Sequence, residues 1–555
     1  MKPKLLTTLK GYSREQLVKD ITAGVIVSII ALPLSIAIAI ASGVSPEKGL
    51  HTAIIAGFLI SMLGGSRVQI GGPTGAFMVI VYGIATEFGI DGLIIATFLA
   101  GLIMILMGVL KLGSVIKFIP YPITTGFTSG IAVVIFSSQI KDFFGLKIGE
   151  VPAEFLEKWK IYFESFNTIN LQATFIGIIA LLIIVLWPKI NRKVPGTLIA
   201  LIVTAVIVRL LNLEVPTIGT KFGELSSALP SIQIPSITFD KVTLLIAPAF
   251  TIAILGSIES LLSAVVSDGM IGSKHRSNME LVAQGVANIA SALFGGIPAT
   301  GAIARTVANI KNGGRTPIAG MVHAVTLLLI MVLFMPLAKM IPLTSLAAVL
   351  IIVAYNMSEW REFKELFKSP KSDVIVLLVT FFITVLIDLV KAIEIGMVLA
   401  AFLFMKRMSE VSTVNITSLD ASEENDEEFD FTKENKKIQT TEGIQIYEIN
   451  GPFFFGAADK FLEAANNLGD KTKTLIIRMR NVPAMDATAL HAFKRIINMC
   501  HHKNIKVLIS GINEQPLNVL RKAELCDVIG NKNFFEGIEE AIEYANKNMA
   551  NETSL

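Results

Sequence analysis

Charge is scarce in this chain: only 17% of its residues are Asp, Glu, Lys or Arg, whereas 52% are hydrophobic. That balance is too apolar for a soluble protein of ordinary composition. Between about residues 20 and 408 the apolar residues form runs of spanning length, because roughly 20 helical residues cross about 30 Å of hydrocarbon. We therefore expect a multi-pass α-helical membrane protein, embedded in a lipid bilayer and followed by a soluble C-terminal part.

Cysteine is also rare. Cys500 and Cys526 are the only two, and neither belongs to a Cys-x-x-Cys or Cys/His metal pattern. We expect no disulfide, no metal site and no cofactor. The net charge of +3 is not gathered into a basic stripe, which argues against a nucleic-acid partner. No nucleophile, base and orienting group occur together in a recognisable motif, so we do not expect an enzyme.

The distribution of basic loops predicts the topology. We count fourteen apolar segments, and an even number places both termini on the same side of the membrane. Short loops rich in Lys and Arg alternate with mixed or acidic loops, and the basic ones face the cytoplasm. Their basic residues are Lys111, Lys117, Lys189, Arg192, Lys193, Lys274, Arg276, Lys311, Arg315, Arg361, Lys364 and Lys368. Both termini are therefore expected in the cytoplasm, and the chain in the inner (cytoplasmic) membrane.

Two apolar segments, the third and the tenth, open with glycine and proline. The first reads GGPTGAFMVI from Gly71 to Ile80, and the second reads GGIPATGAIARTVANI from Gly295 to Ile310. Both contain Thr-Gly-Ala, and their positions divide the chain into two seven-segment halves. Because seven is odd, the halves are expected to be inverted in the membrane. Inverted repeats with broken helices in matching positions are typical of transporters whose site lies between the repeats near the midplane.

These two segments suit an anion. Irregular backbone at membrane depth is tolerated only beside protein or a water-filled cavity, so both should line a site. We interpret Pro73 and Pro298 as the first residues of short helices, where free N–H groups and roughly half a positive charge favour an anion. The alternative is that the glycines only allow crossed helices to pack closely. The candidate binding residues are Thr74, Gly75, Ala76, Phe77, Thr300, Gly301, Ala302 and Arg305.

Two charged residues, Glu259 and Arg305, lie inside apolar segments, where an unpaired charge is costly. One reading is a structural ion pair between them. The functional reading is that Glu259, beside a low-dielectric cavity, binds and releases a proton near neutral pH and couples proton movement to anion movement. Ser263 lies one turn from Glu259 and is a candidate neighbour in the same cavity.

The sequence resembles the SulP family of anion transporters along almost its entire length. The stretches that carry the resemblance are GGSRVQIGGPTGAF from Gly64, GSIESLLSAVVSDGM from Gly256 and GGIPATGAIARTVANIKNGGRTP from Gly295. The resemblance implies a seven-plus-seven inverted repeat with core and gate domains, elevator-like movement of the core and frequent homodimers. It also implies substrates such as sulfate, bicarbonate, chloride or dicarboxylates.

Within that family the chain is similar to the branch of C4-dicarboxylic acid transporters typified by DauA. This similarity rests on IESLLSAVVSDGM, on AYNMSEW from Ala354 and on AFLFMKRM from Ala401. It implies proton-coupled uptake of succinate, fumarate and aspartate. One departure from the family pattern is PEKGLH, where Lys48 and His51 replace the two tyrosines of P-x-Y-G-L-Y.

The C-terminal part resembles a STAS domain, with strands at IQIYEI, KTLIIRM and IKVLISG and a last helix from Phe534. Such a domain implies regulation and a cytosolic protein partner. Thr488 corresponds to a Ser that is phosphorylated in anti-sigma factor antagonists, and the start of a helix favours phosphate. An unmodified hydroxyl at a helix start is the alternative. The expected parts are residues 1–19 (N-terminus), 20–408 (transport), 409–441 (acidic linker), 442–547 (STAS) and 548–555 (tail).

The leading hypothesis is therefore secondary active, proton-coupled uptake of a small dicarboxylate by a homodimer. Sulfate or bicarbonate transport by the same kind of site is the nearest alternative. A second is an exchanger or channel-like pathway in which Glu259 is structural. A third is a membrane-anchored sensor that is read out through its STAS domain.

Overall fold

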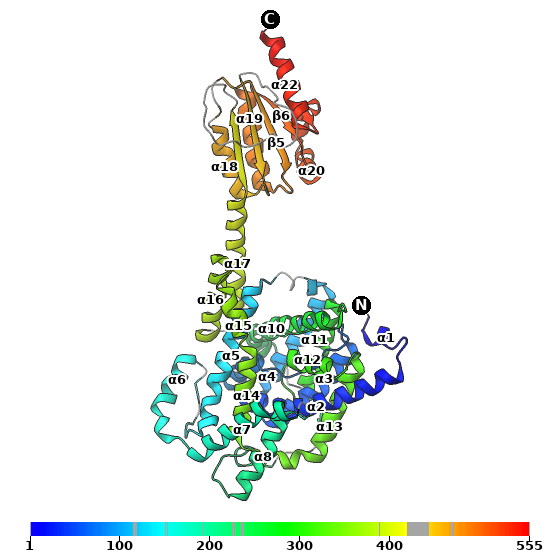
Figure 1. Ribbon diagram of the computed structural model, residues 1–555, viewed down its shortest axis with the longest axis vertical. Helices are drawn as coiled ribbons and strands as arrows, with labels where there is room; N and C mark the ends of the chain where they lie inside the picture. The colour runs from blue at the N-terminus through cyan, green and yellow to red at the C-terminus, as the bar shows by residue number, and fades with distance from the viewer. Residues whose placement is uncertain are drawn as a thin grey trace. The chain divides into compact units, whose positions relative to one another are not determined.

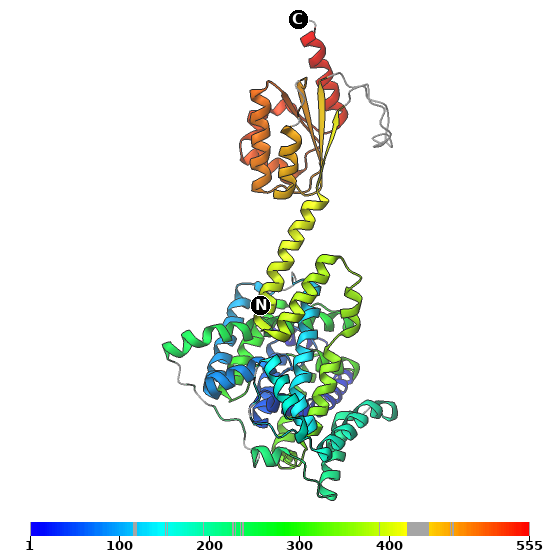
Figure 2. The same ribbon diagram turned by 90° about the vertical axis from the view of Figure 1, so that its left-hand side faces the viewer.

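In the computed structural model the chain divides into two compact units, Met1–Val398 and Leu399–Leu555 (Figures 1 and 2). The structure describes residues 2–553 except 115–118, 150, 153, 192–193, 225–226, 228, 233–234, 236–237, 388, 419–442, 467 and 469–470. The greater part of the predicted acidic linker, residues 419–441, thus lies outside the described residues.

The first unit is helical (Figure 1). Its longer helices are α2 (Arg14–Ala41), α3 (Pro46–Leu63), α4 (Phe77–Val109), α5 (Tyr121–Phe144), α7 (Leu171–Ile190), α8 (Gly196–Leu210), α10 (Phe239–Ile271), α11 (Ser277–Leu293), α13 (Pro317–Ala338), α14 (Leu343–Met357) and α16 (Lys371–Leu386). A further helix, α17 (Leu389–Val411), begins in the first unit and ends in the second. The short helices of the first unit are α1 (Leu5–Thr8), α6 (Phe155–Glu164), η2 (Phe166–Thr168), α9 (Ile218–Phe222), α12 (Ile303–Lys311) and α15 (Trp360–Leu366). This confirms the predicted helical class.

Seven helical stretches among the described residues are long and apolar enough to cross a membrane. They are α2, α4, α5, α7, α10, α13 and the stretch Leu343–Leu366. The count of fourteen segments stays a prediction, partly because α4 joins two of the predicted segments. At the junction, Gly89 has φ 71° and ψ −178°, a backbone conformation that favours glycine and bends the helix.

The helices of the first unit pack as two bundles. The first bundle contains α2, α3, α4, α10, α11, α12 and α13, and the second contains α5, α7, α8, α14, α15 and α16. The closest packing is between α4 and α11, where Gly101 and Gly285 face each other's backbone. A Cβ at Gly101 would lie 2.6 Å from the Gly285 carbonyl, so only small residues permit this approach.

Two short strands within the first unit pair across the chain. β1 (Gly71–Gly72) pairs antiparallel with β2 (Thr300–Gly301), with Gly71 opposite Gly301 and Gly72 opposite Thr300. The two glycine-proline segments identified in the sequence therefore meet. The pairing also satisfies backbone groups that have no helical partner at this depth.

The second unit contains a five-stranded sheet in the order β3-β4-β5-β6-β7. Only β3 runs antiparallel to its neighbour, and the other pairs are parallel. One face is covered by α18 and α19 (Figure 2) and the other by α22. The elements are β3 (Thr413–Ser418), β4 (Ile444–Asn450), α18 (Phe455–Asn466), β5 (Thr474–Asn481), α19 (Ala487–His502), β6 (Lys506–Ser510), α20 (Glu514–Lys522), α21 (Leu525–Ile529), η4 (Asn531–Asn533), β7 (Phe534–Phe535) and α22 (Ile538–Thr553).

Two features of the second unit refine the sequence reading. The helix expected from Phe534 is wrong, because Phe534–Phe535 pairs with Ile509–Ser510 as an edge strand and α22 begins only at Ile538. The predicted linker, 409–441, begins with the end of α17 and all of β3. The sheet thus includes a strand from the N-terminal side of the acidic stretch.

Candidate anion site

The two glycine-proline segments are extended where they pair, and each then turns into a helix. The interpretation of Pro73 and Pro298 as first helical residues is wrong, because α4 begins at Phe77 and α12 at Ile303. The physical reason is the β1–β2 pairing, which holds the residues around both prolines extended. The helix starts nevertheless lie only a few residues beyond the crossing point.

The crossing is held by side chains of the first bundle. Asn288 of α11 pairs with both backbone groups of Ala299: its Nδ2 donates to the Ala299 carbonyl at 2.8 Å, and its Oδ1 accepts from the Ala299 N–H at 2.8 Å. On the other segment, the Ile70 N–H donates to Thr306 Oγ1 at 3.0 Å, and the Ile70 carbonyl accepts from the Ala302 N–H. These bonds keep buried, irregular backbone hydrogen-bonded.

Arg305 projects from the first turns of α12 into this crossing and is only 2% exposed. Its Nη2 donates to the Pro73 carbonyl at 3.2 Å and to Ser35 Oγ at 3.3 Å. Its Nη1 has no partner in the described part of the chain. A Cβ at Gly72 would lie 2.5 Å from that nitrogen, so glycine leaves it room. A buried cationic donor without a protein partner suits an anionic ligand.

The start of α12 adds backbone donors. The first three N–H groups of a helix have no intrahelical acceptor. For Ile303, Ala304 and Arg305 no acceptor occurs among the described residues. Ile303 and Ala304 are exposed residues, so the start of α12 lies at an accessible surface. The guanidinium and the helix start thus present positive potential from the same element.

Glu259 of α10 contacts the other segment. Its Oε2 accepts a hydrogen bond from Thr74 Oγ1 at 2.8 Å. The described residues contain no ion pair between Glu259 and Arg305, so the structural pair that the sequence left open is not formed. Glu259 and Arg305 therefore lie at the same crossing with separate partners.

A cavity reaches Glu259 from between the bundles. A small cavity of about 20 Å³, large enough for roughly one water molecule, is lined by Glu259 and Leu262 of α10 and by Phe127 and Thr128 of α5. It shares Ile119, Phe127, Ile258 and Ile393 with a larger, mostly apolar cavity of about 400 Å³. The carboxylate thus faces the boundary between the first bundle and the second.

The remaining candidate residues take different positions. Thr300 is fully buried, and its hydroxyl donates to the Gly256 carbonyl at 2.8 Å, so it is not free to bind a ligand. Gly301 is covered by Gln69, whose Nε2 occupies the place of a Cβ. Gly75, Ala76 and Phe77 are buried at the start of α4, and Ala302 is buried before α12.

Ser263 is also buried, and its hydroxyl donates to Thr306 Oγ1 at 3.4 Å. It is not among the residues that line the two cavities near Glu259. Thr488 lies in the second unit, exposed in the first turn of α19, after the N-cap Asp486.

Sequence reasoning missed Gln69 and Asn288. Gln69 donates to Ser260 Oγ at 2.8 Å, next to Glu259 in the chain, and Asn288 fixes Ala299. Asn288 is a polar residue in an apolar stretch, which is the signal that could have identified it, whereas Gln69 lies in a polar, glycine-rich stretch that gives no such signal.

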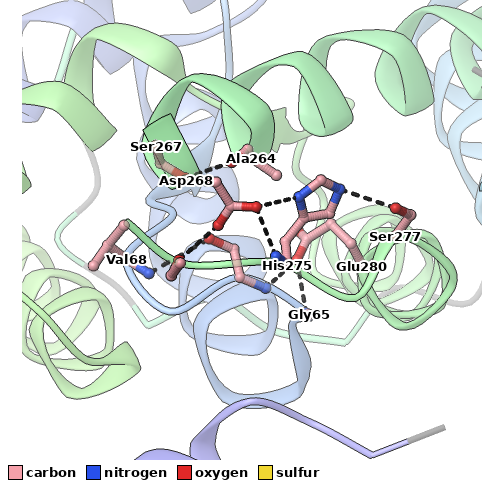
Figure 3. A network of polar contacts seen from close by, with 10 residues as sticks. Gly65, Val68, Ala264, Ser267, Asp268, His275, Ser277 and Glu280 are labelled. Atoms are coloured by element: carbon pink, nitrogen blue, oxygen red, sulfur yellow. Dashed lines mark hydrogen bonds and ion pairs between the residues drawn. The ribbon is translucent and has the colours of Figure 1, made fainter. Parts of the chain in front are cut away.

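A second polar network lies where α10 leads into α11 (Figure 3). His275 Nδ1 lies 2.7 Å from Asp268 Oδ2, and His275 Nε2 lies 2.9 Å from Ser277 Oγ. Nearby, Glu280 Oε2 accepts the N–H groups of Gly65 and Ser66 at 2.8 and 3.0 Å. These bonds fix the chain just before the first glycine-proline segment, so we assign the network a structural role.

Comparison with known proteins gives the family of this chain. The family model described as "Sulfate permease family" matches residues 17–380, and the "STAS domain" model matches residues 435–541. The chain belongs to the sulfate permease family. Sulfate permeases are transporters, so the expectation that the chain is not an enzyme is confirmed. The predicted SulP membership and C-terminal STAS domain are confirmed as well.

Curated relatives within the sulfate permease family match nearly the whole chain. The "Putative sulfate transporter YvdB" of Bacillus subtilis is 43% identical over 96% of this chain and 98% of its own length. The "Bicarbonate transporter BicA" of Picosynechococcus is 29% identical over 95% of this chain and 94% of its own length. The similarity to the C4-dicarboxylate branch stays a prediction beside these sulfate and bicarbonate transporters.

Solved structures show the fold of the chain. The murine Slc26a9 anion transporter superposes with a TM-score of 0.86 over 98% of this chain and 93% of that chain, at 17% identity. The transmembrane domain of a cyanobacterial bicarbonate transporter, BicA, superposes with a TM-score of 0.62 at 30% identity, over 69% of this chain and 98% of that chain. The first likeness confirms the fold, and family membership establishes a membrane anion transporter.

Proposed function

We propose that this chain is a proton-coupled secondary transporter of small anions, with C4-dicarboxylates such as succinate, fumarate and aspartate as the leading substrates. The observation that carries the proposal is the buried Nη1 of Arg305, which has no partner among the described residues, at the crossing of the two glycine-proline segments. The substrate carboxylate would accept hydrogen bonds from this nitrogen and from the free N–H groups of Ile303 and Ala304.

The first segment would supply the rest of the pocket. Thr74, Gly75, Ala76 and Phe77 form the turn into α4, and Thr74 already donates to Glu259. Thr300, Gly301 and Ala302 would act by shaping the second segment, because the Thr300 hydroxyl is bonded to Gly256. The substrate would thus lie between Thr74 and the start of α12.

Glu259 would couple the proton. When ionised, it repels an incoming anion and accepts the Thr74 hydroxyl. When protonated, it is neutral, and the hydroxyl of Thr74 becomes free to turn toward the substrate. Proton and anion would therefore enter and leave together. In the second reading Glu259 is structural and the protein is an exchanger or a channel-like pathway.

The two bundles suggest how the site moves. The crossing, Glu259 and Arg305 all belong to the first bundle, whereas Phe127 and Thr128 across the small cavity belong to the second. An elevator-type movement would carry the first bundle and its substrate past the second. The protein would work as a homodimer in the inner membrane, with both termini and the STAS domain in the cytoplasm, as the basic loops predict.

The STAS domain would regulate this cycle through a cytosolic protein partner. Thr488 is exposed at the start of α19, where a phosphate would be favoured by the helix dipole. If the chain were instead a sensor that signals through this domain, deleting the residues after Lys433 would abolish its function, whereas a carrier would keep reduced or misregulated uptake.

Sulfate is the second candidate substrate. The observation in its favour is the 43% identity to YvdB, which is named as a sulfate transporter, and bicarbonate has similar support from BicA at 29%. One guanidinium and one helix start balance the charge of an anion but do not distinguish a short anion from a long one. Sulfate and succinate therefore suit the same donors.

The deciding experiment is uptake of labelled succinate, sulfate and bicarbonate into proteoliposomes, with and without an inward proton gradient. The proposal expects succinate uptake that rises with the gradient. Sulfate uptake that rises with the gradient, without succinate uptake, would support proton coupling and would show that the substrate is sulfate. Uptake of none of the three anions would reject the proposed function.

A further inference from the structure

Helix α6 stands out because it leaves large apolar side chains uncovered. It belongs to the connection between α5 and α7 and spans Phe155–Glu164. Leu156 is 67% exposed and Phe163 is 73% exposed. Residues seven apart lie on the same face of a helix, so these two side chains form one apolar surface. Exposing Leu156 and Phe163 to water is unfavourable, in proportion to the apolar area left uncovered.

The side of α6 next to this apolar surface is held to the first unit by specific contacts. Trp159 Nε1 donates to Ser137 Oγ of α5 at 3.1 Å. Tyr162 is only 2% exposed, and its ring lies 6.1 Å from that of Trp159. The helix therefore has a fixed orientation, with Leu156 and Phe163 turned outward rather than left on a loose loop.

The contact with Ser137 also sets the depth of α6. Ser137 lies seven residues before Phe144, the last residue of α5, which corresponds to about 10 Å along a helix. Since α5 is long and apolar enough to span a membrane, α6 lies beside the final turns of a spanning helix and not beyond its end. In a helix that spans the bilayer, the last turns lie near the boundary between acyl chains and headgroups, so we infer this depth for α6.

The exposed apolar surface continues along the chain into another span. Phe166, just after α6, is 50% exposed, and Leu171 and Phe175 at the start of α7 are 79% and 59% exposed. α7 is itself a candidate span, so its uncovered apolar side chains face lipid. The outward face of α6 is thus continuous with a lipid-facing surface.

The polar residues of α6 fit the same position. Lys160 is exposed between Leu156 and Phe163 on the outward side, and Glu157 and Glu164 are exposed beside them. A lysine can extend its ammonium group toward the headgroups while its alkyl chain lies along apolar surface.

We propose that α6 is an interfacial helix whose Leu156 and Phe163 insert into the acyl-chain boundary of the bilayer. α6 packs against α5 and α16, both in the second bundle. Membrane anchoring of α6 therefore holds the second bundle at a fixed depth. The proposal concerns a lipid surface and does not depend on which anion is carried.

Single cysteines carrying an environment-sensitive fluorophore test this proposal. Both native cysteines are buried in the second unit, and burial raises the pKa of the Cys500 thiol to about 11, so they label poorly. Leu156→Cys and Phe163→Cys are compared with Thr488→Cys, an exposed site in the STAS domain. Each labelled full-length protein is reconstituted in phosphatidylcholine vesicles with or without brominated acyl chains.

The expected result is an approximately twofold loss of fluorescence at positions 156 and 163 in brominated lipid, as for a probe that reaches the acyl chains, and no change at 488. Quenching of the first two positions by aqueous iodide instead would overturn the proposal. Label-to-label contact between two copies, detected as excimer emission from pyrene probes at 156 and 163, would also overturn it and assign this face to a protein interface.

Discussion

The two glycine-proline segments match in sequence but not in what their shared residues do. Both contain Thr-Gly-Ala and both lead into a helix at the crossing. The Thr74 hydroxyl donates to the carboxylate of Glu259, whereas the Thr300 hydroxyl donates to a backbone carbonyl at Gly256. Only the second segment supplies an arginine. The comparison teaches that an internal repeat locates a site, while the neighbours of each copy decide its role.

The largest effect is expected at Arg305, the charge that only the second segment has. Arg305→Ala should raise the KM for the anion about 10- to 100-fold, because hydrogen bonds to charged groups contribute about 1.5–3 kcal/mol and 1.4 kcal/mol is tenfold. The KM of Arg305→Lys should lie between those of the unchanged protein and Arg305→Ala, because lysine keeps the positive charge and lacks the planar guanidinium group. Uptake kinetics in proteoliposomes measure both, and an unchanged KM in the alanine variant would contradict the site.

Close packing should differ between the segments as well. Gly301→Ala would place a methyl group on Gln69 Nε2, whereas in Gly75→Ala the new Cβ lies 3.0 Å from the flexible end of Ile135. Overpacking of this kind costs about 1–3 kcal/mol, so Gly301→Ala should lower thermal stability measurably and Gly75→Ala much less. Equal melting temperatures for the two variants would show that the crossing is more open than described.

Substitution of Glu259, the hydrogen-bond partner of Thr74 in the first segment, tests whether this carboxylate binds the coupled proton. A proton-coupled carrier should gain up to about tenfold in accumulation for each unit of pH gradient, because one pH unit corresponds to about 1.4 kcal/mol per proton. Glu259→Gln should lose this stimulation, while Glu15→Gln, an exposed residue at the start of α2, should keep it. If the glutamine variant retains its response to the gradient, Glu259 is structural and the exchanger or channel reading is favoured.

The smallest effects are expected from the two threonines. Thr300→Val removes one buried hydrogen bond and should lower stability by about 0.5–1.5 kcal/mol, with little change in the pH profile of uptake. Thr74→Val should lower stability by at least as much, because it also removes a hydrogen bond, and it should in addition shift the pH profile of uptake, since Glu259 loses its hydroxyl partner. Melting curves and pH profiles of uptake are measured for both variants. A shifted pH profile in Thr300→Val but not in Thr74→Val would contradict the assignment.

The sequence predicted which segments would meet, because glycine, proline and threonine recur together in apolar surroundings. It also predicted the helical membrane class and the separate C-terminal domain. It did not predict that the helices begin at Phe77 and Ile303, because the β1–β2 pairing joins residues more than 200 positions apart. A local pattern does not contain that partner.

The supporting residues were missed for the same reason. Asn288 acts by bonding Ala299, and Gln69 by covering Gly301. The residues next to Asn288 and Gln69 in the sequence do not show which segment each of them contacts. The Glu259–Arg305 ion pair is not formed, because each group has another hydrogen-bond partner. Glu259 accepts from a hydroxyl, and Arg305 donates to a carbonyl and a hydroxyl. Distances between helices decided this, and the sequence does not contain them.

The most direct test of an anion bound at the start of α12 is ligand protection of a cysteine at that position. Ala304 is exposed there, so Ala304→Cys should react with a charged thiol reagent, and the native cysteines are buried. Saturating succinate or sulfate should slow the reaction severalfold, whereas gluconate should not. An identical reaction rate with and without the transported anion, in a variant that still carries it, would contradict the account.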